Sequence, residues 1–230
     1  MLNYSIVIPC YNEFDNLLKL IPEIDKSLEN YNNFEIIIIN DCSQDNTKNI
    51  KNYLNIKVPL RLVSNITNRG QSFSIYEGVK NSKNDNIITI DGDCQNNPND
   101  INKLINLYEK KSLDLIGGIR KKRKDSVNKK IGSYLANKIR KYILKDNCDD
   151  SACGLKIFKK NYFLKISYFS GLHRFLPALF SGMKCNLYFV EVDHRERNSG
   201  KSNYDNFTRF FYGLRDIFKV IMIIRRIKFD

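Results

Sequence analysis

The stretch NIITIDGDCQ, from Asn86 to Gln95, decides the fold that we expect for this chain. Its first half, residues 87–90, is a run of apolar and β-branched side chains, which is typical of a strand buried on both faces of a parallel sheet. Two carboxylates, Asp91 and Asp93, follow this run directly. Open α/β sheets bind their ligands outside the carboxyl ends of the strands. The stretch therefore predicts a ligand site at that edge of the sheet.

The same residues offer oxygen ligands for a metal ion. Asp91, Asp93 and Gln95 lie close together in sequence, and such hard oxygen atoms suit Mg²⁺ or Mn²⁺ that also carries a phosphate ligand. A second interpretation is an acidic turn that caps the next helix, because Asn97 and Pro98 resemble an N-cap and a first helical position. The stretch by itself leaves both interpretations open.

The chain up to residue 120 alternates between strand-like and helix-like patterns. We expect strands over residues 4–9, 34–39, 60–63, 87–90 and 113–117. We expect helices over residues 17–28, 45–54 and 98–110, with a further helix that opens at residues 68–70. Pro22 is expected to kink or split the first helix. This alternation predicts an α/β fold, with a mostly parallel sheet, right-handed crossovers and helices on both faces.

The pattern changes after Arg120. Further strands are expected over residues 154–158 and 186–192, and helices over residues 131–144 and 172–181. The last segment, residues 207–227, repeats Phe, Ile and Arg with a period near that of a helix, which predicts an amphipathic helix. Such a helix lies in a membrane interface or packs on the domain or on a partner. We divide the chain into an α/β domain, residues 1–205, and a C-terminal amphipathic helix, residues 206–230.

The charge of the chain narrows the classes of partner. The 230 residues carry a formal net charge of +13, which implies an anionic partner such as nucleic acid, a membrane surface or a phosphate-bearing substrate. Six Lys and Arg side chains fall within residues 121–130, and the alternative for this basic stretch is a solvated loop. No nucleic-acid motif is recognised, and aromatic residues do not alternate with the basic ones, so we expect no nucleic-acid partner.

The cysteines and the first residues bear on the compartment. The six cysteines are scattered without a C-x-x-C pair, as expected for reduced thiols in the cytoplasm. Met1 runs almost directly into the first expected strand, so we expect no signal peptide. No apolar run approaches the roughly 20 residues of a membrane span. These features predict a cytoplasmic protein.

Eight short motifs in a fixed order cover the chain to about residue 217 and carry a family resemblance. They are IVIPCYNE (6–13), EIIIINDCSQDNT (35–47), NRGQSFSIYEG (68–78), DGDCQ (91–95), GGIRKKR (117–123), DDSACGLKIF (149–158), GLHRFLPAL (171–179) and HRERNSGKSNY (194–204). Together they resemble the family 2 glycosyltransferases of the GT-A fold, specifically the dolichyl- and polyprenyl-phosphate sugar transferases. The last two motifs resemble the bacterial polyprenyl-phosphate branch.

The resemblance implies a nucleotide site in the first motifs. Pro9, Tyr11 and Glu13 match the loop that holds the nucleotide base in the family, and Asp41 matches a residue that contacts the nucleoside. Asp91, which also matches a nucleotide-sugar contact, belongs with Asp93 to the D-x-D motif that binds the ribose and the metal diphosphate. Gln95 matches a further metal ligand. The resemblance thus implies that Asp91, Asp93 and Gln95 hold Mg²⁺ or Mn²⁺.

The resemblance also implies a set of groups that face phosphate. Arg120, Arg197 and Ser202 match segments that approach the donor diphosphate or the acceptor phosphate, and Arg195 and Lys201 are further cations for positioning an acceptor. Arg120 stands with Asp91 and Asp93 among the expected catalytic residues. The alternative for the arginines at 195 and 197 is a surface ion pair with Glu191 or Glu196.

Two positions depart from the family pattern. Asn40 replaces the first Asp of the D-D-G-S motif, and Cys42 stands where Gly is usual. If that position adopts a positive φ, Cys42 is strained, because a side chain clashes with the backbone there. Lys129 or Lys130 is a substitute for an arginine pair that the family often carries after Arg123.

The chemistry of the acceptor decides whether a base is needed. A hydroxyl acceptor needs a base, for which Asp149 and Asp150 are the candidates. A lipid phosphate, with a second pKa of about 6, is mostly dianionic at pH 7 and needs positioning by cations instead. His173 and His194 have no Ser or Cys nucleophile motif beside them, so we expect them to orient neighbouring groups.

We therefore expect an inverting, metal-dependent glycosyltransferase that moves a sugar from a UDP- or GDP-sugar to a polyprenyl phosphate. The chain would be peripheral at the inner face of the membrane, held by its cations on the anionic surface, with a separate integral-membrane partner as a further expectation. The alternatives are a family 2 transferase with a soluble or polysaccharide acceptor, and an inactive relative that serves as a scaffold.

Overall fold

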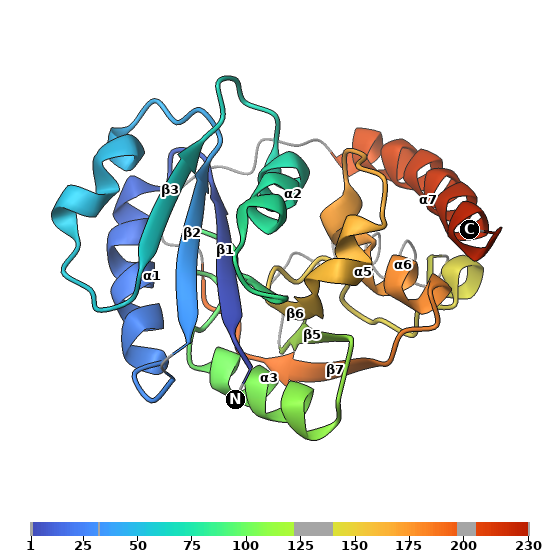
Figure 1. Cartoon of the computed structure of the whole chain (residues 1–230). Helices are drawn as coiled ribbons and strands as arrows, with labels where there is room; N and C mark the ends of the chain where they lie inside the picture. Colours follow the sequence, from blue (N-terminus) through green and yellow to red (C-terminus); the bar gives the residue numbers. More distant parts are fainter. Residues whose placement is uncertain (1, 32, 122–139, 197–205, 230) are drawn as a thin grey trace.

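The computed structural model of the chain describes residues 2–31, 33–121, 140–196 and 206–229 (Figure 1). The strands are β1 (Tyr4–Cys10), β2 (Phe34–Asn40), β3 (Leu60–Ser64), β4 (Asn86–Thr89), β5 (Leu115–Arg120), β6 (Lys156–Lys159) and β7 (Leu187–Val192). The helices are α1 (Phe14–Ser27), α2 (Gln71–Asn81), α3 (Asp100–Lys110), α5 (Lys160–Leu164), α6 (Leu176–Gly182) and α7 (Asn206–Phe229), with two 3₁₀ helices, η1 (Asn46–Tyr53) and η2 (Leu172–Arg174).

The strands form one sheet in the order β3-β2-β1-β4-β6-β5-β7. All neighbours are parallel except β6, which runs antiparallel to both β4 and β5. Thr89 of β4 pairs with Lys156 of β6, so the amino end of β6 lies at the carboxyl end of β4. The prediction of a mostly parallel α/β sheet is confirmed, and each expected strand is present.

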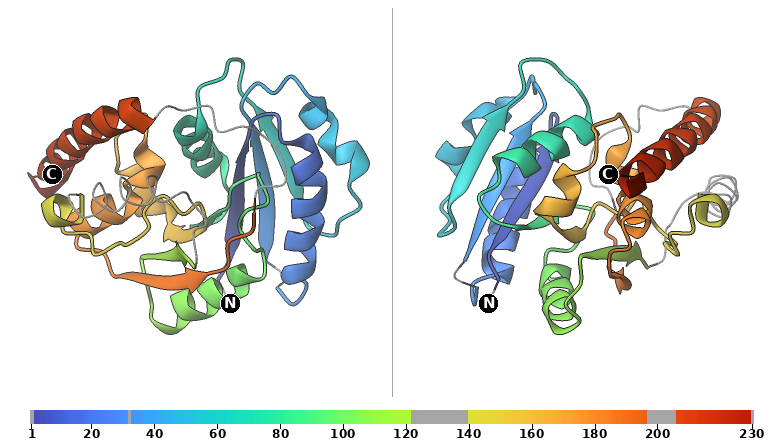
Figure 2. Two further views of the ribbon diagram at one scale, coloured as in Figure 1. Left: turned by 180° about the vertical axis from the view of Figure 1, so that it is seen from behind. Right: turned by 45° about the vertical axis from the view of Figure 1, so that its right-hand side comes forward.

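Helices cover both faces of the sheet (Figure 2). The side chains of β1 alternate between the two faces, so that Ile6 and Ile8 pack with α1 and α3, and Val7 packs with α2 on the other face. Every residue of β1, β2 and β4 is buried, which explains their unbroken apolar runs. The second face is completed by aromatic side chains from α5 and α6 and by apolar residues of α7.

Three predictions about helices are wrong in detail. α1 continues through Pro22 without a break, because Leu17, Leu20, Ile21 and Ile24 bury a continuous apolar stripe on the sheet. The segment expected as a helix over residues 45–54 is the 3₁₀ helix η1, which buries only two side chains and so lacks such a stripe. The helix expected over residues 172–181 is two elements, η2 and α6, and α6 starts with a proline in its first turn.

α7 confirms the expected C-terminal helix. Ile217 and Val220 are buried against the domain, and a Cβ atom at Gly182 of α6 would lie only 2.7 Å from Ile224, so these two helices pack closely. Phe218 and Met222 point outward, with exposed fractions of 67% and 55%. Within the described residues, no helix combines the length and the hydropathy that crossing a bilayer requires.

Candidate active site

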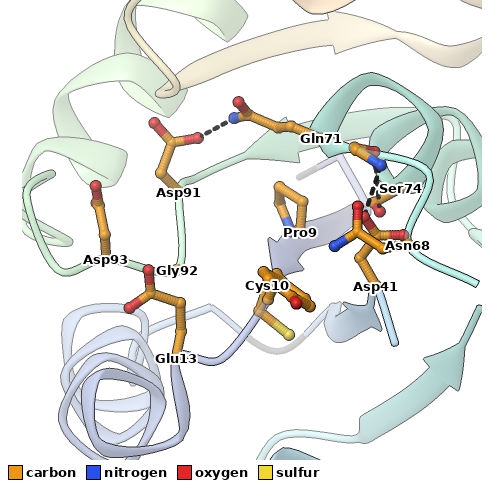
Figure 3. A pocket seen from close by; sticks show the side chains of 12 residues that line it. Pro9, Cys10, Glu13, Asp41, Asn68, Gln71, Ser74, Asp91, Gly92 and Asp93 are labelled. Carbon is orange, nitrogen blue, oxygen red and sulfur yellow. Dashed lines mark hydrogen bonds between the residues drawn. The ribbon is translucent and has the colours of Figure 1, made fainter. Parts of the chain in front are cut away.

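A cavity of about 450 Å³ opens at the carboxyl ends of β1, β2 and β4 (Figure 3). This edge of the sheet is where the strand order and the two Asp residues predict a ligand site. The lining brings together six of the residues singled out in the sequence, Pro9, Tyr11, Glu13, Asp41, Asp91 and Asp93. It also includes residues to which the sequence assigned no role, namely Cys10, Asn68, Gly70, Gln71, Ser74 and Gly92.

The loops that follow β1 and β2 are braced against each other. The Asn12 amide N–H donates to Ser43 Oγ at 2.9 Å, and the Gln44 N–H donates to Asn12 Oδ1 at 2.7 Å. The Phe14 N–H donates to Asp45 Oδ2 at 2.9 Å. These bonds fix the backbone around the cavity mouth, where 43% of Tyr11 is exposed.

Asp41 joins the end of β2 to the start of α2. Its buried carboxylate accepts hydrogen bonds from the backbone N–H groups of Arg69 and Gly70, at 3.0 and 2.7 Å, and from Asn65 Nδ2 at 2.7 Å. Gly70 has a φ of +84°, a conformation that glycine adopts without strain. Asp41 therefore shapes the loop that forms one wall of the cavity.

The two departures from the family pattern have different consequences. Asn40 Oδ1 accepts a hydrogen bond from the Ser43 N–H at 2.9 Å, so the amide supplies an acceptor that a carboxylate would also supply. Cys42 has a φ of +64°, the conformation that strains a side chain at this glycine position. The strain at Cys42 is therefore present, while the change at Asn40 preserves the local turn.

Asp91 and Asp93 point into the cavity from the turn after β4 (Figure 3). Burial, followed by the charge of Asp93, raises the pKa of the Asp91 carboxyl to about 6, against the opposing charges of Lys156 and Arg120. Gln71 Nε2 donates to Asp91 Oδ1 at 2.7 Å. A divalent cation would relieve the repulsion between the two carboxylates.

Asp91 and Asp93 suit a cation that binds together with a phosphate-bearing substrate. No group of three or more His, Cys, Asp or Glu side chains within the described residues is placed to hold a metal alone. Mg²⁺ sites in nucleotide enzymes commonly take one or two carboxylates and complete their shell with phosphate oxygens and water. Asp91 and Asp93 are the two carboxylates that the protein would contribute to such a site. Gln95 is not among the lining residues, and its carbonyl accepts from the Arg195 N–H at 2.8 Å.

Gly154 lies directly against Asp91. A Cβ atom built at this glycine would overlap the Cγ, Oδ1 and Oδ2 atoms of Asp91. The Gly154 carbonyl accepts a hydrogen bond from Thr89 Oγ1 at 2.8 Å, which fixes the glycine beside the end of β4. The motif that contains Gly154 is visible in the sequence, but only the antiparallel placement of β6 reveals its contact with Asp91.

The sequence model of glycosyl transferase family 2 matches residues 5–167. The chain belongs to glycosyl transferase family 2. It is 31% identical to the dodecaprenyl-phosphate galacturonate synthase of Rhizobium johnstonii, over 97% of this chain and 68% of that protein. It is also 31% identical to the undecaprenyl-phosphate 4-deoxy-4-formamido-L-arabinose transferase of Shewanella sediminis, over 87% of this chain and 61% of that protein. The chain thus spans roughly two thirds of the length of these relatives.

Solved structures confirm the GT-A fold of this family 2 glycosyltransferase. The glucosyl-3-phosphoglycerate synthase of Mycobacterium tuberculosis in complex with UDP matches 96% of the chain and 81% of its own, with a TM-score of 0.73 and 14% identity. The mannosyl-3-phosphoglycerate synthase of Rubrobacter xylanophilus matches 99% of the chain and 74% of its own, with a TM-score of 0.71 and 14% identity. At this identity the likeness concerns the fold alone.

Of the residues expected to face phosphate, the structure describes Arg120 and Arg195, and neither lines the cavity of this glycosyltransferase. Arg120 donates from Nε and Nη2 to the two oxygens of Asp150, at 2.6 and 2.7 Å, in a largely buried ion pair. Arg195 pairs with Glu23 of α1 at 2.7 Å, a partner that the sequence did not suggest, and Arg197 lies outside the described residues.

Several expected residues fall outside the described part of the glycosyltransferase. They are Arg197, Lys201 and Ser202, together with Lys129, Lys130 and most of the basic stretch. Of that stretch, Lys121 is described and lies 3.7 Å from Glu191. Of the two candidate bases, Asp150 is held by Arg120, and Asp149 pairs with Lys141 at 2.5 Å. The roles that the sequence assigned to these residues stay predictions.

His173 lies within hydrogen-bonding distance of a neighbouring hydroxyl. Its Nδ1 atom lies 2.6 Å from Ser72 Oγ at the start of α2. Burial, helped by the charges of Arg174 and Lys156, lowers the pKa of His173 to about 3. The imidazole of the glycosyltransferase is therefore neutral in the folded state at neutral and mildly acidic pH.

The neutral state of His173 predicts a loss of stability in acid. In the unfolded chain His173 binds a proton below about pH 6.5, whereas in the folded chain it does not until about pH 3. The free energy of unfolding should therefore fall as the pH decreases from 6.5 toward 3, by roughly 1 kcal/mol per pH unit from this group. Urea unfolding of wild type and His173→Asn at pH 7, 6 and 5 measures the difference. Stability curves that run parallel in the two proteins would contradict the assignment.

Proposed function

We propose that this glycosyltransferase moves a sugar from a UDP- or GDP-sugar to a polyprenyl phosphate. The observation that carries the proposal is the placement of Asp91 and Asp93 in one cavity with Asp41, Tyr11 and Glu13, at the carboxyl edge of the sheet. The two relatives described above are polyprenyl-phosphate enzymes by name, and they align with most of this chain. Their names support the acceptor class, and the cavity supports the donor class.

In this proposal Asp91 and Asp93 would hold Mg²⁺ or Mn²⁺ when the donor binds, with Gln95 as a further ligand. The ion, when bound, neutralises the charge that develops on the leaving diphosphate. Pro9, Tyr11, Glu13 and Asp41 hold the nucleoside part of the donor. A solved neighbour, a glucosyl-3-phosphoglycerate synthase from Mycobacterium tuberculosis, has been crystallised in complex with Mn²⁺ and UDP, which supports a cation of this kind.

The acceptor phosphate supplies its own nucleophile, so a protein base is not required. A phosphate dianion attacks from the face opposite the diphosphate, and the anomeric configuration is inverted. Positioning of this dianion falls to the cations Arg120, Arg195, Arg197 and Lys201, with Ser202 as a donor. This scheme accounts for the pairing of both candidate bases with cations in the described structure.

The lipid acceptor requires contact with a membrane, which we assign to α7 and the basic stretch on the cytoplasmic face. The outward side of α7 carries Arg215, Phe218, Met222, Arg225 and Arg226, all exposed. Apolar side chains flanked by arginines are typical of a helix that lies on an anionic bilayer surface. A separate integral-membrane protein is a further partner in this proposal, and nucleic acid is not.

Vesicle binding tests the role of α7. Each cation near an anionic surface contributes about 1 kcal/mol, so Arg225→Gln with Arg226→Gln should weaken sedimentation with phosphatidylglycerol vesicles by about 30-fold. The matched control replaces two exposed lysines away from α7, Lys51 of η1 and Lys57 shortly after it, with glutamine. The segment of residues 46–57 lies across the sheet from α7 (Figure 1). Equal losses in both double variants would show a general charge effect and would remove α7 from the proposal.

The donor test is a thermal-shift titration with UDP and GDP, each with and without Mn²⁺. Saturation at 100 times Kd adds about 2.7 kcal/mol of stability, which is a rise of about 5 to 10 °C for a domain of this size. We expect such a rise with one nucleotide, its dependence on Mn²⁺, and its loss in Asp93→Ala. The control is Asp15→Ala, which removes an exposed carboxylate of α1 outside the cavity. No rise with either nucleotide would favour an inactive scaffold.

The acceptor test measures nucleotide release from the matching nucleotide sugars. We expect release with undecaprenyl phosphate in detergent and none with the dephosphorylated lipid alcohol. Release with soluble sugars or polysaccharide, and none with the lipid phosphate, would instead support the soluble-acceptor alternative.

A further inference from the structure

Two segments far apart in the chain meet behind the cavity. The Gly171 N–H donates to Ser72 Oγ at 2.9 Å, across 99 positions of the sequence. Ser72 Oγ also lies 2.6 Å from His173 Nδ1. Ser72 belongs to the first turn of α2, and the other two residues belong to the turn of η2, which packs against α2 (Figures 1 and 2).

The direction of these hydrogen bonds follows from their donors and acceptors. The Ser72 hydroxyl has one proton, and it already accepts the Gly171 N–H. His173 is neutral, so one of its ring nitrogens is an acceptor. We infer that the Ser72 hydroxyl donates its proton to Nδ1 at 2.6 Å, which places the imidazole proton on Nε2. Ser72 is thus held from two sides by η2.

Gln71 stands between two anchored residues. On one side Gly70 donates its N–H to Asp41 at 2.7 Å, and on the other side Ser72 is held by η2. The side chain of Gln71 is exposed and long, and its amide nevertheless donates to Asp91 Oδ1 at 2.7 Å (Figure 3). Because the backbone of Gln71 is fixed, holding its long side chain in this one geometry costs less conformational entropy.

We propose that Ser72 and His173 are positioning residues for Asp91, acting through Gln71. The Gln71 amide occupies one oxygen of the Asp91 carboxylate and fixes the direction of the other, as residues behind a metal ligand commonly do. The inference rests on the proposed function, in which Asp91 is a ligand of the donor's cation. It adds to the proposed function a chain of contacts that runs from η2 through Ser72 and Gln71 to the cavity.

The first experiment is a double-mutant cycle on Mn²⁺-dependent nucleotide affinity, measured by calorimetry. Loss of an outer-shell partner typically weakens metal affinity 10- to 100-fold, so we expect at least a tenfold loss in Gln71→Ala and about tenfold in Ser72→Ala. Because Ser72 acts through Gln71, the double variant should bind no more weakly than Gln71→Ala alone. Losses that multiply, or unchanged affinity in Ser72→Ala, would overturn the proposal.

The histidine offers a rescue test. Asn at position 173 can present its Oδ1 near the place of Nδ1 and accept the Ser72 proton, whereas Leu cannot. We expect near wild-type affinity in His173→Asn and the Ser72→Ala loss in His173→Leu. The matched control is Ser82→Ala, because Ser82 is a buried serine at the other end of α2 whose hydroxyl donates to the Val79 carbonyl. Equal affinity in the Asn and Leu variants would contradict a role for the hydrogen bond.

A measurement without ligand separates this inference from the proposed function. The side-chain amide signal of Gln71 in an ¹⁵N spectrum, assigned by its absence in Gln71→Ala, should be displaced from the free-glutamine position in wild type. It should move to that position in Ser72→Ala and His173→Leu and stay displaced in His173→Asn. A signal unmoved by Ser72→Ala would refute the positioning even if nucleotide binds. Absence of nucleotide binding with the expected signal changes would refute only the proposed function.

Discussion

Gly154→Ala is expected to lower the affinity for the metal nucleotide at least 100-fold. A methyl group at this position would occupy the space of the Asp91 carboxylate, since a Cβ atom there overlaps Cγ and both oxygens. The neighbouring backbone cannot retreat easily, because Thr89 Oγ1 holds the Gly154 carbonyl at 2.8 Å. Asp91 must therefore turn away from the cavity, which removes one of the two carboxylates that we propose hold the cation.

Calorimetry with UDP or GDP and Mn²⁺ measures this loss. The control is Ala152→Gly, a change of the same single methyl at an exposed position two residues earlier. Circular dichroism of Gly154→Ala checks that the sheet persists. Affinity within threefold of wild type would show that the turn before β6 relaxes, and that Asp91 does not depend on the glycine.

The second large effect concerns the ion pair between Arg120 and Asp150. Asp150→Ala leaves a guanidinium that is only 15% exposed without its carboxylate, and such a loss typically costs about 3 to 5 kcal/mol. Arg120→Met should lower the free energy of unfolding by a similar amount, because it leaves the Asp150 carboxylate without the guanidinium. The double variant Arg120→Met with Asp150→Leu should cost less than the sum, because neither charge is then left unpaired in the interior.

Urea unfolding of the three variants and of Lys141→Met decides this point. Lys141 forms a comparable but solvent-exposed pair with Asp149, and exposed pairs contribute about 0 to 1 kcal/mol. A cost below 1 kcal/mol for Asp150→Ala would show that this ion pair does not stabilise the fold.

The sequence predicts the sheet well because the buried strands have a local signature. The runs in β1, β2 and β4 are apolar at nearly every position, and this pattern is typical of strands with both faces covered. Asp41, Asp91 and Asp93 directly follow strands or their exit turns, so the sheet topology alone brings them to one cavity. These parts of the site depend on local sequence and on a general rule of α/β folds.

The remaining contacts could not be predicted, because they join segments that are far apart in the chain. No sequence pattern indicates that these segments meet. The position of Gly154 in the sequence does not indicate that β6 runs antiparallel beside β4. The contact of Gly154 with Asp91 follows only from that register. The bond between Ser72 and His173 spans 101 positions and depends on the packing of η2 on α2. Asp150 could not be predicted as the partner of Arg120, because charge patterns do not specify which groups pair.

The position of β6 also determines at what point in the synthesis of the chain the cavity can be completed. β6 is inserted between β4 and β5, two strands that leave the ribosome earlier, and the turn before it supplies the glycine that packs on Asp91. A nascent chain that ends before β6 therefore has the carboxylates of the cavity but not the wall behind them. Because β4 and β5 are joined in the sheet only through this strand, the cavity is completed only after about two thirds of the chain has been made.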